Sequence, residues 1–289
     1  MLPVLLDLKF IKIYTFGVFL VLAFFWSSFL LWKNIRLTSY KEEEVFDTLF
    51  LSLTGAIFFS RLFYVVLNFS KFGFSISKFI LINGYPGLSL IGAIFGGILV
   101  SFIYINNKKI NFNEMADYFV SPVFIALGFG KLGSFFSGVE VGIKTNMFVA
   151  IKYVGYDGFR HLTPFYESVL FFVGAFISYK LLLNIRREKM SRGFVLLFFL
   201  WYFNLIYFVF DKLKANRLYL VGQSFNGMIS AIMLLTFSIY FIYYFRISII
   251  LKLRNISNLL KEYGQKNWKK TNRSKNTIGA GKTKDSSPN

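Results

Sequence analysis

The chain of 289 residues contains no cysteine, a single histidine and few charged side chains. Without cysteine it forms neither disulfides nor thiolate metal sites, which excludes a disulfide-stapled secreted module and a thiol nucleophile of its own. One histidine, His161, makes histidine-rich metal catalysis an unfavourable hypothesis. Charged residues account for 16% of the chain, compared with roughly 25% in an ordinary soluble domain.

Apolar residues dominate what is present. They make up 55% of the chain, aromatic residues make up 21%, and the mean hydropathy is +0.55. A soluble core of this size has no room for so many apolar side chains, and a chain this rich in aromatics does not remain disordered. The composition therefore predicts a protein that crosses a membrane several times.

Seven stretches are long and apolar enough to cross the hydrocarbon core as helices, which takes roughly 20 residues. The first has a Trp32–Lys33 edge and lacks a small-residue cleavage site, so we expect it to be retained rather than removed as a signal peptide. The sequence predicts an all-α membrane protein, a bundle of seven transmembrane helices, over residues 13–32, 46–68, 86–106, 116–137, 164–184, 193–211 and 219–245.

The net charge of +19 is unevenly placed, because the last 44 residues alone carry +9. Lysine and arginine also follow the first, third and fifth predicted spans, and cytoplasmic loops are enriched in these residues. We therefore expect the N-terminus outside and the C-terminus in the cytoplasm. Residues 1–245 would form the membrane domain and 246–289 a basic, flexible tail that contacts anionic lipid. Lipid explains this charge better than nucleic acid does.

Two features within or next to the predicted spans are candidate functional sites: Arg61 and the glycine-rich stretch Gly87–Gly97. An ionisable residue inside a bilayer span is costly and marks a candidate site. Arg61 is either a snorkelling residue or a planar donor for a lipid phosphate. The glycines allow close helix packing, or they leave backbone N–H groups free for an anion near Ser89 and Gly92.

A second polar stretch runs from Gly128 to Gly142 at the end of the fourth predicted span. It combines the cation of Lys131 with two hydroxyls, Ser134 and Ser137, and with the carboxylate of Glu140. Buried polar groups at this density need partners. The stretch predicts a polar pocket, although its composition alone is a weak signal.

The third candidate is the segment from His161 to Glu167, which enters the fifth span. Histidine is suited to proton transfer near neutral pH, but on sequence alone His161 is better interpreted as an ordinary loop residue. Tyr166 and Glu167 follow it, and Glu167 falls inside the predicted span. We therefore expect a cationic partner for Glu167, either Lys131 or Arg61, if the helices meet.

These segments occur in the order and at the spacing of one known family. The chain resembles prolipoprotein diacylglyceryl transferases, which are seven-helix bacterial membrane enzymes. The resemblance covers about residues 10–245. It rests on Ile13–Gly17, Glu44–Asp47, Ser60–Val65, Gly87–Gly97, Ala116–Asp117 with Gly130–Gly138, His161–Glu167 and Ser224–Met233.

Several positions depart from the family pattern. A family histidine falls on Ile91 and a family arginine on Ile206, neither of which carries charge or protons. The signature arginine is Lys131, which offers a point charge in place of a bidentate fork. Other family positions are occupied by Ser134 and Ser137 for asparagines, Val139 for an acid with Glu140 next to it, Phe16 for a tyrosine, Phe210 for an acid with Asp211 next to it, and Gly227 for a glutamine.

The resemblance implies a reaction in the bacterial inner membrane that uses no metal or organic cofactor. The diacylglyceryl group of phosphatidylglycerol moves to the cysteine thiol of a prolipoprotein signal peptide, and glycerol phosphate leaves. The partners would be phosphatidylglycerol, signal peptides and the bilayer, not nucleic acid.

For this chain we expect two sets of residues to carry that reaction. The catalytic residues would be His161, Lys131, Glu140 and Glu167. The headgroup-binding residues would be Arg61, Lys131, Ser89, Gly92, Ser134, Ser137 and Tyr166. The substitutions at Ile91 and Ile206 motivate an alternative, a non-catalytic relative that binds phospholipid or signal peptide. A transporter is disfavoured because no internal repeat is apparent.

Overall fold

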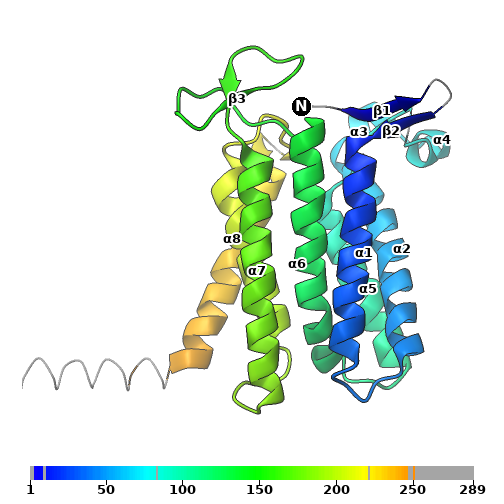
Figure 1. Ribbon diagram of the computed structural model, residues 1–289, viewed down its shortest axis with the longest axis vertical. Helices are drawn as coiled ribbons and strands as arrows, with labels where there is room; N and C mark the ends of the chain where they lie inside the picture. Colours follow the sequence, from blue (N-terminus) through cyan, green and yellow to red (C-terminus); the bar gives the residue numbers. More distant parts are fainter. Residues whose placement is uncertain (1–2, 9–10, 83, 221, 247–249, 251–289) are drawn as a thin grey trace, which may run out of the picture. The chain divides into compact units, whose positions relative to one another are not determined.

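The computed structural model describes residues 3–8, 11–82, 84–220, 222–246 and 250. These residues contain seven apolar helices long enough to cross a membrane, which confirms the predicted number (Figure 1). The helices are α1 (Thr15–Ile35), α2 (Glu42–Leu67), α5 (Leu90–Asn107), α6 (Phe112–Ser137), α7 (Thr163–Arg186), α8 (Phe194–Asp211) and a last helix, Phe225–Arg246.

Short elements not predicted from the sequence occupy the loops at one end of these helices, which we call the hairpin end (Figure 1). Three antiparallel hairpins lie there, together with two short helices between α2 and α5. These elements are β1 (Val4–Leu8) with β2 (Ile11–Tyr14), β3 (Ile151–Lys152) with β4 (Phe159–Arg160), β5 (Tyr219–Leu220) with β6 (Gln223–Ser224), α3 (Phe69–Phe72) and α4 (Ile76–Ile80).

Helix α6 has clear start and stop signals in its sequence. The Asn111 side chain accepts a hydrogen bond from the Glu114 N–H, and an acid in the first turn suits the positive end of the helix. The helix ends at Gly138, whose φ of 75° lies in the left-handed region that glycine adopts without strain. Although Pro122 and several glycines soften its pattern, α6 is continuous over 26 residues.

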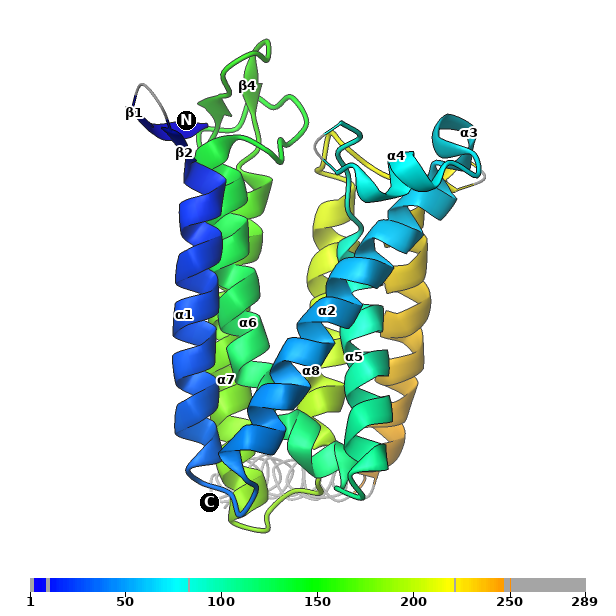
Figure 2. The same ribbon diagram turned by 90° about the vertical axis from the view of Figure 1, so that its right-hand side faces the viewer.

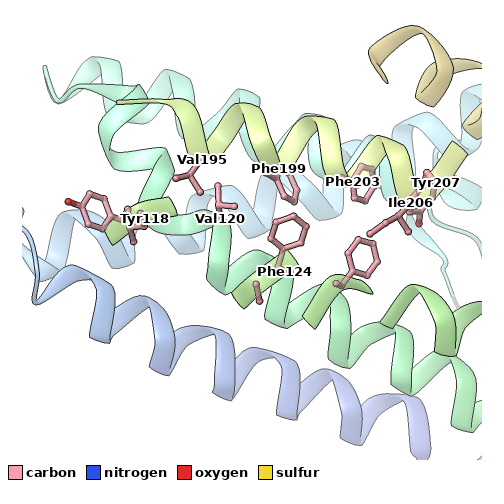
Figure 3. Packing of buried hydrophobic residues seen from close by; sticks show 11 residues of the cluster. Tyr118, Val120, Phe124, Val195, Phe199, Phe203, Ile206 and Tyr207 are labelled. Atoms are coloured by element: carbon pink, nitrogen blue, oxygen red, sulfur yellow. The ribbon is translucent and has the colours of Figure 1, made fainter. Parts of the chain in front are cut away.

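The helices of the first compact unit, residues 1–237, pack in two groups. Helix α1 lies beside α6, α6 beside α7 and α8, and α2 leans against α5 (Figure 2). A buried aromatic cluster joins α6, α7 and α8 around Phe124, which is fully buried against Phe171 and Phe199 (Figure 3). This cluster fixes the three helices that carry the site described below.

Helices α2 and α5 pack closely where glycines of α5 face phenylalanines of α2. A Cβ on Gly92 would lie 2.7 Å from the Phe59 carbonyl oxygen, and a Cβ on Gly96 would lie 2.4 Å from the Phe59 Cβ. The glycines of the Gly87–Gly97 stretch therefore serve close helix packing, which is one of the two roles considered for them.

The second compact unit spans residues 238–289. Its residues 238–246 complete the last helix. The tail predicted over 246–289 lies outside the described residues, apart from Arg246 and Ile250.

Candidate functional site

Lys131 lies within α6, two turns before the hairpin end, and is 4% exposed. Its ammonium nitrogen lies 2.6 and 2.8 Å from the two carboxylate oxygens of Glu140 and 2.8 Å from Oε2 of Glu167. The expected pairing of Glu167 with a buried cation is confirmed for Lys131. Because a buried charge needs an opposite charge or hydrogen-bond partners, these contacts explain how a lysine is buried within the bundle.

Glu167 connects this lysine to a second one. The Glu167 side chain is fully buried at the start of α7, and its Oε1 lies 2.5 Å from the ammonium nitrogen of Lys214. The aromatic ring of Tyr207 on α8 lies beside both cations, with its centroid 4.0 Å from the Lys214 nitrogen and 5.5 Å from the Lys131 nitrogen. We call Lys131, Glu140, Glu167, Lys214 and Tyr207 the lysine–glutamate cluster.

The cluster depends on a backbone contact between two loops at the hairpin end. The segment after α6 pairs with the segment after α8 through an isolated bridge between Gly142 and Lys214. The N–H of Ala215 donates to the carbonyl oxygen of Val141, and the N–H of Ile143 donates to that of Leu213. This pairing holds Lys214 over the end of α7.

Glu140 and Lys214 are the two cluster members outside the helices, and their pKa values are lowered for different reasons. Burial opposes ionisation of Glu140, but Lys131 and Lys214 outweigh it and hold the pKa of this carboxyl below its usual value. Burial, together with Lys131, lowers the pKa of the Lys214 ammonium, although Glu167 and Glu140 act in the opposite direction. Glu140 is also the member that solvent reaches, with about a third of its side chain exposed.

His161 is buried next to this cluster by backbone contacts. Its N–H donates to the Ile143 carbonyl oxygen, and its own carbonyl oxygen accepts from the Tyr153 hydroxyl. A Cβ on Gly142 would lie 2.4 Å from the His161 carbonyl oxygen, so only glycine fits beside it. The loop pairing that positions Lys214 therefore also positions His161.

Three other predicted site residues surround the same end of α6. Ser134 and Ser137 are buried in its last turn, and the Ser137 hydroxyl donates to the Ser134 carbonyl oxygen at 3.4 Å. The Tyr166 hydroxyl donates to the Val149 carbonyl oxygen, which attaches the loop between α6 and α7 to the start of α7. Of these three, the two serines face the buried side of the bundle.

Arg61 is buried in α2, but its contacts differ from those of Lys131. The guanidinium donates to the carbonyl oxygens of Lys78, Phe79 and Gly87 at 2.7, 2.8 and 2.9 Å. No carboxylate lies within 4.0 Å of it among the residues that the structure describes. The segment between α2 and α5 contains α3 and α4, and we call it the α3–α4 loop. Arg61 thus holds this loop against α2, and it is not brought to Glu167.

Ser89 and Gly92 also have local roles in the structure. The Ser89 hydroxyl accepts from the Gly92 N–H and caps α5, and the Ser89 N–H donates to the Ser60 carbonyl oxygen. Helix packing fills the space beside Gly92. The N–H groups of Ser89 and Gly92 therefore both donate to partners within the chain.

The substituted family positions lie in apolar or tightly packed surroundings. Ile206 is buried in the aromatic cluster of α6–α8 (Figure 3). Asp211, one turn after Tyr207, is 3% exposed, and a Cβ on Gly227 would lie 2.7 Å from its Oδ2. The glycine at position 227 therefore leaves room for the Asp211 carboxylate.

Lys214 and Tyr207 are the cluster members that the sequence did not identify. Lys214 follows the sixth predicted span by three residues, where a lysine is indistinguishable by sequence from an ordinary loop cation. The signal that could have identified it is its neighbour Asp211, an acid at the very end of that span. No metal site accompanies these residues, since no three His, Cys, Asp or Glu side chains gather in the described part of the chain.

Comparisons with known proteins agree on one family. The model of the family "Prolipoprotein diacylglyceryl transferase" matches residues 3–244. Among relatives named phosphatidylglycerol–prolipoprotein diacylglyceryl transferase, that of Clostridioides difficile is 29% identical over 77% of this chain and 87% of its own length. The relative from Clostridium novyi is 26% identical over 81% and 92%, and that from Listeria monocytogenes 24% identical over 85% and 90%. The chain therefore belongs to the prolipoprotein diacylglyceryl transferase family, and its seven apolar helices make it a multi-pass protein of the bacterial inner membrane.

Proposed function

We propose that this protein transfers the diacylglyceryl group of phosphatidylglycerol to the cysteine thiol of a prolipoprotein signal peptide. The thiolate sulfur forms a bond to the terminal glyceryl carbon, the bond from that carbon to the phosphate oxygen breaks, and glycerol phosphate leaves. The nucleophile comes from the peptide, so the absence of cysteine from this chain is consistent with the reaction. The observation that supports the proposal is the buried lysine–glutamate cluster at one end of α6–α8.

In this proposal Lys131 holds the phosphate and Glu140 occupies its place before the lipid arrives. The three N–H groups of the ammonium face two carboxylates, and of these Glu140 is the exposed one while Glu167 is fully buried. An entering phosphate would displace Glu140 from Lys131, while Glu167 would stay in contact with the lysine. The positive charge of Lys131 would then stabilise the negative charge that develops on the leaving phosphate. Lys214 would hold the Glu167 carboxylate in position.

The thiol proton needs an acceptor close to the same place. Glu140, once displaced from Lys131, becomes a free carboxylate beside the entering peptide, and His161 is the second candidate. The proton would then pass to the departing phosphate, so that the cluster returns to its starting charge. Ser134, Ser137 and Tyr166 would shape the cavity around the headgroup, whereas Arg61, Ser89 and Gly92 would position the neighbouring loop and helix.

We further propose that the hairpin end faces outward, with the N-terminus outside and the C-terminus in the cytoplasm. The loops at the other end contain Lys33, Arg36, Lys41, Lys108, Lys109, Arg187, Lys189 and Arg192, or lie directly beside them, and such residues mark the cytoplasmic side. The cluster would then lie at the depth of the outer headgroups, where exported signal peptides arrive.

The test is transfer of radiolabelled diacylglyceryl from phosphatidylglycerol to a lipobox peptide by purified protein in liposomes. Replacement of Lys131 by alanine should lower transfer at least about 10³-fold, because the developing charge loses its stabilising group, while the protein stays in the membrane. Replacement of Lys180, an exposed lysine on α7, by alanine is the matched control and should leave transfer unchanged.

Two further variants separate the proton acceptors. Glu140→Gln should lower the turnover rate while strengthening lipid binding, since it removes the competitor for Lys131, whereas His161→Gln should leave lipid binding unchanged. Normal transfer by Lys131→Ala would contradict the proposal. A wild-type protein that binds phosphatidylglycerol but puts no label on the peptide would establish the non-catalytic alternative.

A further inference from the structure

A hollow of about 290 Å³ lies between α2 and α4, and none of its lining residues belongs to the lysine–glutamate cluster. Its wall on α2 is formed by Thr54, Ile57, Phe58 and Arg61, and its other wall by Phe79 and Ile80. The four α2 residues follow the spacing i, i+3, i+4, i+7, so they form one stripe along the helix. This apolar stripe runs for about 10 Å, at 1.5 Å per residue, and ends at Arg61.

Arg61 brings a positive charge to the end of this stripe. The guanidinium is 2% exposed, and its partners are three backbone carbonyl oxygens and the ring of Phe72 at 5.0 Å. Carbonyl groups satisfy its hydrogen bonds without cancelling its charge. Two of the five guanidinium N–H groups are left over after these three bonds.

The loop that covers the hollow is both apolar and basic. Two large apolar side chains are exposed there: Phe74, just before α4, is 96% exposed, and Ile76, the first residue of α4, is 76% exposed. Lys71 and Lys78 lie on the same loop, and the sequence contains no Asp or Glu between Asp47 and Glu114. Exposed apolar side chains with interspersed lysines are typical of segments that lie in a membrane interface and contact anionic lipid.

We propose that the hollow binds one acyl chain of an anionic phospholipid, with its phosphate near Lys71, Lys78 and the free N–H groups of Arg61. The α3–α4 loop lies in the headgroup layer, and the α2 stripe below it receives the chain. This site collects anionic lipid from the leaflet by charge and does no chemistry. Because it shares no lining residue with the lysine–glutamate cluster, it can exist whether or not that cluster transfers lipid.

The natural absence of cysteine makes a direct test possible. A single Ile80→Cys substitution accepts a fluorescent NBD label at the hollow. The matched control is Val21→Cys, on the exposed face of α1 and three turns from Lys33, the basic residue of that helix. Each labelled protein is placed in phosphatidylcholine nanodiscs that contain the same mole fraction of either phosphatidylglycerol or phosphatidylcholine with brominated acyl chains. Bromine quenches the label only when a brominated chain touches it.

At position 80 brominated phosphatidylglycerol should quench the label about fivefold more effectively than brominated phosphatidylcholine. This ratio is the enrichment expected from one lysine near an anionic lipid. At position 21 the two lipids should quench equally. The Lys71→Gln/Lys78→Gln variant should lose most of the preference at position 80, and Lys131→Ala should keep it. Equal quenching at position 80 by both lipids, or an undiminished preference without the two lysines, would overturn the proposal. If addition of a lipobox peptide abolished the quenching at position 80, the hollow would be assigned to the peptide instead.

Discussion

Two buried cations occupy the two helix groups of this protein, and their partners differ in kind. Lys131 on α6 faces the carboxylates of Glu140 and Glu167, whereas Arg61 on α2 faces three carbonyl oxygens. Carboxylates neutralise a cation and can be exchanged for another anion. Backbone carbonyls orient a cation, fix the loop that carries them and leave its charge in place.

Under the proposed function, this difference separates a cluster that reacts from a cation that holds a loop in place. In the lysine–glutamate cluster, exchange of one exposed carboxylate for a phosphate changes no net charge in the interior, so substrate entry needs little reorganisation. Around Arg61 the loop cannot leave without breaking three hydrogen bonds of a buried guanidinium, and each bond lost there costs free energy. The following experiments test that contrast, starting with the largest expected effect.

Separation of Glu167 and Lys214 should produce the largest loss of stability. Removal of one partner of a buried ion pair costs about 3–5 kcal/mol, because the other charge stays buried and unpaired. We expect Glu167→Gln and Lys214→Met each to lower the free energy of unfolding in detergent by about that amount, and the double variant to lose less than the sum.

The exposed pair between Lys12 and Asp7 is the control, since both side chains are about 60% exposed. Lys12→Met should change the free energy of unfolding by less than about 1 kcal/mol. Strict additivity of the Glu167 and Lys214 effects would show that the two side chains do not depend on each other.

Much of the helical part of this contrast was predictable from the sequence. Hydropathy alone predicts seven spans, but it places the start of α2 at residue 46 while the helix begins at Glu42. Three consecutive glutamates lower the hydropathy there, yet they stabilise the first turn through the helix dipole. Charged helix ends are therefore the part of a span that a hydropathy window omits.

The site was predictable only where sequence neighbours meet. Lys131 and Glu140 are separated by one helix end and a glycine turn, and the pairing of Lys131 with Glu167 follows once α6 and α7 are adjacent. The position of Lys214 depends on a bridge between two loops without periodic patterns. The carbonyl partners of Arg61 lie in a loop whose short helices no pattern indicates.

The glycine contact between α2 and α5 gives the next largest effect. An alanine at Gly92 would place its Cβ 2.7 Å from the Phe59 carbonyl oxygen, so the helices would have to separate. We expect Gly92→Ala to reduce the free energy of unfolding by about 1–3 kcal/mol. Thermal unfolding in detergent measures this.

Gly130, next to Lys131, provides the matched control, because nothing lies within 4 Å of a Cβ built there. Gly130→Ala should stabilise α6 by up to about 1 kcal/mol through a smaller loss of backbone freedom. Equal destabilisation by the two alanines would mean that contact with α2 does not explain the glycine at 92.

Arg61→Lys tests whether this cation acts by holding the loop. Lysine keeps the charge but lacks the planar donor geometry, so it cannot serve the carbonyl oxygens of Lys78, Phe79 and Gly87 together. We expect amide hydrogen exchange in residues 74–90 to become faster, and lipid transfer to fall by less than about tenfold. Unchanged exchange together with abolished transfer would instead make Arg61 a direct phosphate ligand.

The smallest predicted effect concerns the pH dependence that Glu140 contributes. Its carboxyl has a pKa below the usual 4.5 in the folded protein, since Lys131 and Lys214 favour the ionised form more strongly than burial opposes it. A lowered pKa means that ionised Glu140 stabilises the folded state above pH 4.5, and that this stabilisation disappears as the pH falls below it. We expect a contribution of at most about 1 kcal/mol, because a third of the side chain is exposed and solvent screens the pair.

Comparison with Glu140→Gln isolates this contribution from those of the other acidic residues. The wild type should lose more stability than the variant between pH 6 and pH 3 in thermal unfolding scans, and the two curves should converge at the acidic end. Parallel curves would show that Glu140 is not held by Lys131 in solution. The proposed exchange of this carboxylate for a phosphate would then lose its physical basis, because Glu140 would not be bound to Lys131 and the lipid would have no carboxylate to displace.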